Sequence, residues 1–131
     1  MHEWALAEAV ATSLSRYIRD VGTSKIERLI IALGELQAID REIFEFALSE
    51  IMRSSGIDVK SLELVTEEAV FKCNACGYEW RLKDLNIPEE IRESIHFLPE
   101  AVFAYVKCPR CGSPDFVIVK GRGLNIVGIE L

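Results

Sequence analysis

The chain has 131 residues, of which 50% are hydrophobic and 27% are charged, and its formal net charge at pH 7 is −6. The apolar fraction excludes a disordered chain, and the acidic balance argues against nucleic acid as a partner. No apolar run approaches the roughly 18 residues of a membrane span. Because Glu3 and Glu8 stand where a secretory signal needs basic residues, we expect a cytoplasmic protein without a membrane partner.

The first half of the chain predicts a small unit of strand, helix and strand. Residues 3–21 place their apolar side chains on one helical face. Residues 25–36 are rich in β-branched and apolar residues and predict a buried strand. Asp40 is a candidate N-cap for the next helix, and residues 59–66 predict a second strand. Such a βαβ unit has parallel strands and a right-handed crossover.

The second half contains two Cys-x-x-Cys motifs separated by 31 residues. A hairpin arm is predicted after the first motif, and a short helix begins at Pro88. Residues 101–106 are apolar and predict a strand that leads into the second motif. Residues 124–131 alternate in polarity and predict a last strand that returns to the first sheet.

The predicted fold class is therefore α+β. It consists of a small mixed three-stranded sheet with two helices, built on the βαβ unit, and an inserted four-cysteine zinc-ribbon domain. The predicted boundaries are 1–68 and 121–131 for the α/β domain and 69–120 for the zinc ribbon.

The four cysteines, Cys73, Cys76, Cys108 and Cys111, predict one structural zinc site. Two residues between thiols aim both sulfurs at one point, and the glycine after each pair permits the left-handed turn of a metal-binding knuckle. Iron in a rubredoxin-like site would use the same ligands, and two disulfides are the remaining alternative. Four sulfur ligands leave no position for an activated water, so no enzymatic role is expected. Because this segment is expected to have little core of its own, the metal should supply most of its folding free energy.

The chain begins Met1-His2-Glu3. The terminal amine, the His2 amide nitrogen and the His2 Nδ1 can reach one ion and form adjacent chelate rings in a plane. Ni(II) and Cu(II) favour such planar nitrogen sets, whereas Zn(II) does not. Three positions of the plane are filled in this way, and the fourth ligand must come from Glu3, from water or from another histidine. A solvated terminal histidine without a ligand role is the alternative.

His96 is the second of two histidines, and it lies between the cysteine motifs. It is a candidate fourth nickel ligand, which would couple the orientation of the ribbon to nickel affinity. Packing among its apolar neighbours in the sequence is the alternative.

These features together resemble the HypA/HybF family of accessory proteins that insert nickel into nickel–iron hydrogenases. The resemblance rests on the Met-His-Glu start, the run LIIALGEL from Leu29, the Phe-Glu-Phe of the following acidic helix, and the two cysteine motifs. It spans essentially the whole chain, although the 31-residue spacer is longer than is usual in the family.

The resemblance implies a nickel metallochaperone that carries Ni(II) as cargo at Met1, His2 and Glu3. It implies structural Zn(II) at the four cysteines. It also implies a HypB-type GTPase as partner, the hydrogenase large subunit as acceptor, and urease maturation proteins as further partners in some organisms.

Two other functions are compatible with the cysteine spacing. One is a zinc-ribbon adaptor that binds a protein partner and has no nickel role, and the other is a rubredoxin-like electron carrier. A nucleic-acid ribbon is disfavoured because residues 67–121 carry nine acidic and seven basic side chains, without a basic stripe. Glu35 follows the buried strand and is expected to face solvent or a partner.

Overall fold

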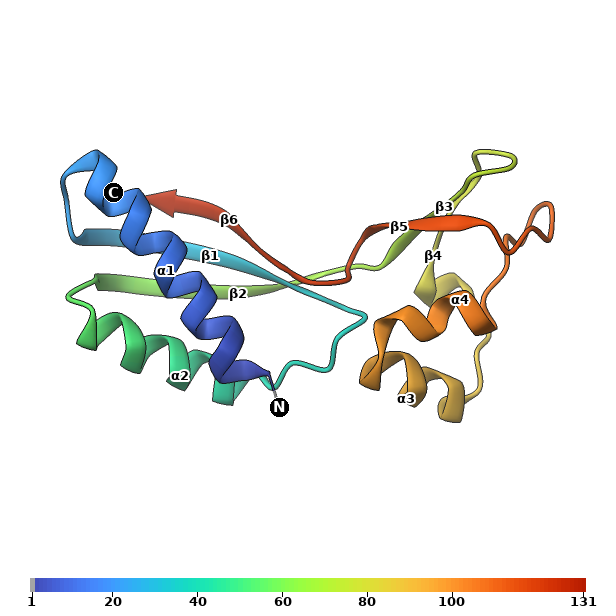
Figure 1. The fold of residues 1–131 in the computed structure, drawn as a ribbon, viewed down its shortest axis with the longest axis horizontal. Coiled ribbons are helices and arrows are strands. Elements are labelled where there is room, and N and C mark those ends of the chain that lie inside the picture. The colour runs from blue at the N-terminus through green and yellow to red at the C-terminus, as the bar shows by residue number, and fades with distance from the viewer. Residues whose placement is uncertain (1) are drawn as a thin grey trace. The chain divides into compact units, whose positions relative to one another are not determined.

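A computed structural model of the protein describes residues 2–131 and shows a mixed α/β fold with two three-stranded sheets (Figure 1). The elements follow in the order α1 (Glu3–Val21), β1 (Lys25–Gly34), α2 (Arg41–Ser54), β2 (Asp58–Glu67), β3 (Val70–Cys73), β4 (Glu79–Arg81), the 3-10 turn η1 (Leu82–Asp84), α3 (Glu89–Phe97), the 3-10 turn η2 (Pro99–Ala101), α4 (Val102–Tyr105), β5 (Phe116–Lys120) and β6 (Leu124–Glu130). The predicted α+β class, with a three-stranded sheet, two helices and a separate four-cysteine segment, is confirmed.

The chain divides into two compact units. Unit 1 comprises residues up to Ala32, then 39–65 and 125–131, and unit 2 comprises 33–38 and 66–124. The predicted boundaries differ from this division at residues 66–68 and 121–124, which lie in unit 2. The largest difference is the segment 33–38, which also lies in unit 2. The physical reason is that the backbone of this segment hydrogen-bonds to the chain near Glu67 and Gly121.

Unit 1 is built on the sheet with strand order β2-β1-β6, and its helices α1 and α2 pack against each other (Figure 1). The N–H of Asp58 donates to the carbonyl of Ser24, and the N–H of Glu35 donates to the carbonyl of Glu67, so β1 and β2 run in the same direction. The returning strand β6 lies on the other side of β1, as the alternation of residues 124–131 predicts.

The core of unit 1 comes from one face of each helix and from β1. Its side chains are buried at helical spacing in α1 and α2, where contact between helices removes their apolar area from water. The buried hydrophobic residues are Ala7, Val10, Ala11, Leu14, Ile26, Leu29, Ile31, Ala32, Phe44, Ala47, Leu48, Met52 and Ile57. Asp40 caps α2 as expected, because its carboxylate accepts from the N–H of Ile43 at 3.1 Å.

Unit 2 has a core of its own, which corrects the expectation that the cysteine segment has little core. Its antiparallel sheet has the strand order β4-β3-β5, with Phe71 opposite Trp80 on one side and Ile118 on the other. The buried cluster also includes side chains from the segment between the cysteine motifs. The cluster consists of Leu36, Ala69, Phe71, Cys73, Trp80, Leu82, Ile95, Val102, Val106, Cys108 and Phe116.

The predicted strand over residues 101–106 is wrong, because this segment forms the turn η2 and the short helix α4. Pro99 occupies the first position of η2, where its fixed φ favours a helical turn. Val102 and Val106 are buried, whereas the three residues between them are exposed. That spacing of four is the helical period, and the N–H of Val106 donates to the carbonyl of Val102 at 2.8 Å.

A close backbone crossing lies within unit 2, where residues 33–38 meet the segment around Gly121. The N–H of Gly34 donates to the carbonyl of Gly123 at 2.6 Å, and the N–H of Leu36 donates to the carbonyl of Gly121 at 2.8 Å. A Cβ at position 34 would lie 2.4 Å from the Gly123 oxygen, so only glycine fits there.

Candidate metal sites

The four cysteine sulfur atoms meet at one point in unit 2, and all lie within 4.8 Å of one another. The Sγ atoms of Cys73 and Cys111 are 3.6 Å apart, and those of Cys76 and Cys108 are 3.7 Å apart. These separations are far too long for disulfides, which excludes that alternative for this structure. A tetrahedron with metal–sulfur bonds of about 2.3 Å has sulfur–sulfur edges of about 3.8 Å. The thiols are therefore arranged as four ligands of one tetrahedral ion.

Both knuckles have the backbone conformation that their sequence predicts. Gly77 and Gly112 adopt φ values of +79° and +75°, in the left-handed region that favours glycine. In the first knuckle the N–H groups of Ala75 and Cys76 point at the Sγ of Cys73, at 3.3 and 3.4 Å. Backbone donors of this kind stabilise negative charge on sulfur.

The titration of the thiols shows why such a cluster needs a cation. The N–H groups of Cys76 and Ala75 lower the pKa of Cys73 to about 7. For Cys111, the N–H of Ser113 acts to lower the pKa, but neighbouring thiol groups, that of Cys73 first, raise it to about 12. Ionisation of one thiol thus opposes ionisation of its neighbours, since adjacent thiolates repel each other. A divalent ion at the centre removes this repulsion.

At the amino terminus, His2 and Glu3 have different surroundings, and Met1 lies outside the described residues. His2 is exposed and precedes α1, and its side chain makes no capping hydrogen bond. Glu3 is only 5% exposed, and its Oε2 accepts from the backbone N–H of Asp40 at 3.3 Å. Glu3 therefore ties the first turn of α1 to the residue that caps α2, a contact between positions 37 apart that no local pattern indicates.

His96 lies half-buried in α3, within unit 2, whereas His2 belongs to unit 1. Among residues 2–131, the four cysteines form the only group of three or more histidine, cysteine or acidic side chains close enough to hold one ion. The role of His96 as a nickel ligand thus stays a prediction.

At the backbone crossing in unit 2, the carboxylates of Glu35 and Glu67 each accept a hydrogen bond from a backbone N–H group. The sequence did not predict that these two residues act at the same place. The Oε1 of Glu35 accepts from the N–H of Ala69 at 3.0 Å, and the Oε1 of Glu67 accepts from the N–H of Gly121 at 2.8 Å. Glu35 was expected to face solvent or a partner, and in the structure it is half-buried and hydrogen-bonded within unit 2. No short motif marks either contact, because the partners are 34 and 54 residues apart.

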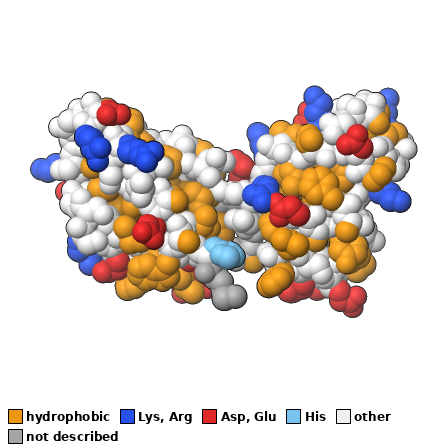
Figure 2. Space-filling model, viewed as in Figure 1, with side chains coloured by type: hydrophobic (Ala, Val, Ile, Leu, Met, Phe, Trp, Pro, Cys, Tyr) orange, Lys and Arg blue, Asp and Glu red, His pale blue; other side chains and the backbone are white. Residues whose placement is uncertain are grey.

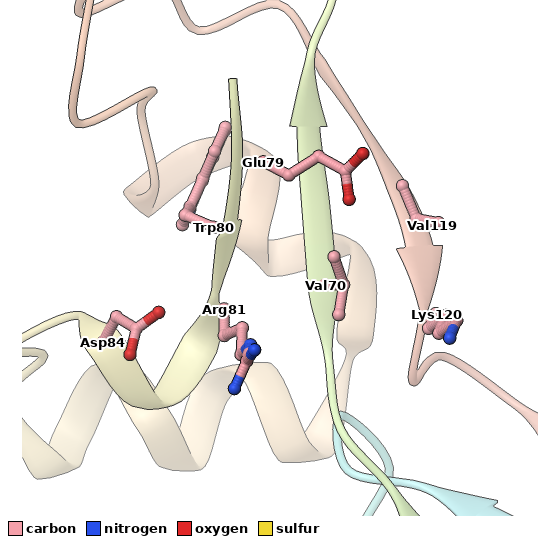
Figure 3. A pocket seen from close by; sticks show the side chains of 7 residues that line it. All are labelled: Val70, Glu79, Trp80, Arg81, Asp84, Val119 and Lys120. Carbon is pink, nitrogen blue, oxygen red and sulfur yellow. The ribbon is translucent and has the colours of Figure 1, made fainter. Parts of the chain in front are cut away.

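The outer face of the unit 2 sheet carries an open hollow of about 510 Å³ (Figure 3). Its lining consists of Val70, Glu79, Trp80, Arg81, Asp84, Val119 and Lys120. In Figure 3 the side chains of β4 and β5 flank Val70 of the central strand. The lining offers carboxylates and cationic groups but neither imidazole nor thiol, so it lacks the soft ligands and imidazoles typical of zinc or nickel sites.

Comparison with known proteins identifies the family. The family model described as "Hydrogenase/urease nickel incorporation, metallochaperone, hypA" matches residues 1–131. The chain belongs to the HypA family. The hydrogenase maturation factor HypA of Pyrococcus horikoshii is 46% identical to it, and that of Thermococcus kodakarensis is 44% identical. Each alignment covers 100% of this chain and 96% of the relative.

The fold is also that of a solved HypA structure. The solution structure of the Ni metallochaperone HypA from Helicobacter pylori matches with a TM-score of 0.67 at 20% sequence identity. The match covers 100% of this chain and 97% of that one. The predicted resemblance to the HypA family is thus confirmed, and the family description favours nickel insertion over the adaptor and electron-carrier alternatives. None of the described helices is both long and apolar enough to cross a membrane.

Proposed function

We propose that this HypA-family chain is a nickel metallochaperone that binds Ni(II) at Met1, His2 and Glu3 and delivers it during hydrogenase maturation. The observation that carries the proposal is the exposure of His2 immediately before α1. The first backbone bond of this helix runs from the N–H of Leu6 to the carbonyl of His2. The helix therefore does not use the His2 amide nitrogen, which can lose its proton to nickel without loss of a helical hydrogen bond.

The proposed ligands are the terminal amine, the amide nitrogen of His2 and its Nδ1. These three nitrogens occupy three corners of the planar set that Ni(II) prefers, and the fourth corner, opposite the His2 amide nitrogen, is left for a ligand from Glu3, from water or from another histidine. The Glu3 carboxylate is engaged with the Asp40 N–H, so we assign it a positioning role: it holds the first turn of α1 while the imidazole stays accessible. An exposed chelate made by one chain end suits an ion that must be released to an acceptor.

We assign a structural Zn(II) to Cys73, Cys76, Cys108 and Cys111. Four thiolates satisfy its tetrahedral preference and leave no open position, so the ion stabilises unit 2 and activates no water. The protein is accordingly proposed to have no enzymatic activity of its own. Its proposed partners are a HypB-type GTPase, the hydrogenase large subunit as cytoplasmic acceptor and, in some organisms, urease maturation proteins.

Metal analysis of the untagged protein tests this function, with His2→Ala as the variant. The wild type should bind one nickel per chain and show the absorption of planar Ni(II), and His2→Ala should lose both. His96→Ala is the second test variant, because it removes the other histidine. A loss of nickel affinity in His96→Ala would make that imidazole a ligand, while unchanged affinity would end its candidacy. Zinc should remain in every variant.

A fusion of extra residues before Met1 should also impair nickel binding, because it removes the amine from the chelate. Acidification should weaken binding, since amine, amide and imidazole must all lose protons first. If untagged His2→Ala protein bound one planar nickel as tightly as the wild type, the proposed site would be wrong.

A further inference from the structure

Three large apolar side chains are exposed together near the start of α1 and α2. Trp4 is 50% exposed and Phe46 is 60% exposed, and their rings contact edge to face with centroids 6.2 Å apart. Ile43 is also exposed, and it lies one helical turn before Phe46 on the same side of α2. We call Trp4, Ile43 and Phe46 the aromatic patch. Figure 2 shows hydrophobic side chains gathered along the lower rim of the unit that contains α1 and α2.

The core of unit 1 does not require this patch. The buried faces of both helices are formed by other residues, Ala7 and Val10 in α1 and Ala47 and Leu48 in α2. Single exposed apolar residues are common on protein surfaces, but two aromatic rings in contact with each other and with water are typical of an interface. Tryptophan in particular is enriched among the side chains that dominate binding energy.

Acidic side chains surround the aromatic patch. Glu8 lies one turn after Trp4 in α1, and Glu42 lies one turn before Phe46 in α2. Glu45, the neighbour of Phe46, is exposed as well. Among the described residues no cation forms an ion pair with these three carboxylates. An apolar patch with an uncompensated acidic rim is complementary to an apolar segment with lysine or arginine at its edges.

Trp4 is two residues from His2, so the aromatic patch and the proposed nickel site both lie at the start of α1. We propose that the aromatic patch is the docking surface for the GTPase that exchanges nickel with this chain, through an apolar segment of the GTPase with basic residues at its rim. This inference rests on the proposed function. A segment seated on Trp4 would lie at the start of α1, close in the chain to the proposed nickel ligands.

The test measures binding of the purified HypB-type GTPase from the same organism to Trp4→Ala and Phe46→Ala. Each variant should bind at least about tenfold more weakly, which equals about 1.4 kcal/mol, within the range for truncation of a central aromatic anchor. Tyr17→Ala is the matched control. It removes an exposed aromatic ring from the same helix, about 20 Å along the axis from Trp4, and should bind like the wild type.

The charge argument has a separate variant, Glu42→Lys with Glu45→Lys. It should slow association with the GTPase and reduce the dependence of the association rate on salt, because steering by complementary charge is lost. Both positions are exposed on α2, so the fold should be retained.

Nickel content, measured on the same samples, separates the two proposals. One nickel per chain in Trp4→Ala and Phe46→Ala, together with weakened GTPase binding, supports the docking surface. Wild-type affinity for the GTPase in both variants overturns it and leaves the nickel site standing. The docking proposal would also be wrong if the wild type were a homodimer that Trp4→Ala dissociates, because a second copy would then cover the patch. It would be wrong as well if the GTPase did not bind the wild type.

Discussion

The core of unit 2 leads to a quantitative prediction for Phe71→Ala. Phe71 is fully buried in the central strand β3, and its ring contacts those of Trp80 and Phe116 at centroid distances of 5.6 and 5.5 Å. Truncation of a buried phenylalanine costs about 3–5 kcal/mol of unfolding free energy, because apolar burial is lost and a cavity remains. For a unit of this size, 1 kcal/mol changes the melting temperature by about 4–8 °C, so the transition of unit 2 should fall by at least about 12 °C.

Calorimetry of the zinc-loaded protein measures this transition, and zinc content is determined on the same samples. Phe97→Ala is the control, because Phe97 lies in the same unit but is 87% exposed. Its effect should stay within about 0.5 kcal/mol. The large loss is expected because the apolar cluster contributes to stability alongside the metal. If Phe71→Ala lowered the melting temperature no more than Phe97→Ala, the cluster would be irrelevant and the metal alone would hold unit 2.

Two further predictions concern carboxylates. Glu3→Gln should retain one planar nickel per chain but lose about 1 kcal/mol of unfolding free energy. The loss is expected because a neutral amide accepts a hydrogen bond from the Asp40 N–H less strongly than a carboxylate does. Loss of the planar nickel spectrum in this variant would show that the carboxylate itself is a ligand. The hydrogen bond from Arg122 to Glu100 lowers the pKa of Glu100, so its stabilisation is present above the ordinary carboxyl pKa and disappears as pH falls through the lowered value. Arg122→Met should therefore reduce the unfolding free energy by less than about 1 kcal/mol at pH 7 and leave it unchanged at pH 2, as measured by chemical denaturation. An equal loss at both pH values would contradict the ionic origin of the stabilisation.

The features that sequence predicted well are local. The Cys-x-x-Cys spacing and the glycine after each pair determine a knuckle within five residues, and both knuckles have the expected geometry. The helical periodicity of α1 is likewise a property of one segment, and this helix buries Ala7, Val10 and Leu14 at helical spacing. Each of these signals needs no information about the rest of the chain.

The features that sequence missed depend on distant pairs or on very short elements. α4 has four residues, which are too few for a periodic pattern to distinguish it from a strand. Pro99 lies between α3 and α4, so the buried residues Ile95 and Val102 do not belong to one continuous helical pattern. The core of unit 2 combines such short pieces with β3, so no single window of sequence contains it. The contact of Glu3 with Asp40 joins positions 37 residues apart, and only the packed fold brings them together.

The aromatic patch illustrates a third reason why sequence alone does not predict which apolar residues are buried. Ile43 is spaced with the buried residues of α2, so helical periodicity alone would place it in the core, yet it is exposed together with Phe46. Periodicity reports only that a helix has an apolar face, and it does not say whether the face is covered within the chain or by a partner. Positions that fit the stripe but remain exposed are therefore candidates for an interface.

The division into two units is consistent with opposite requirements for the two proposed metals. A structural ion must not leave. Four thiolates in closed tetrahedral geometry would retain the proposed zinc, and two of the four cysteines are buried among apolar side chains. A cargo ion must leave on demand, and a planar set of nitrogens at an exposed chain end provides accessibility and a ligand geometry that zinc does not favour. Because the donor types differ, each ion has a thermodynamic reason to prefer its own site. A single site could not combine retention with release, so the proposed function requires both the four-cysteine cluster and an exposed His2.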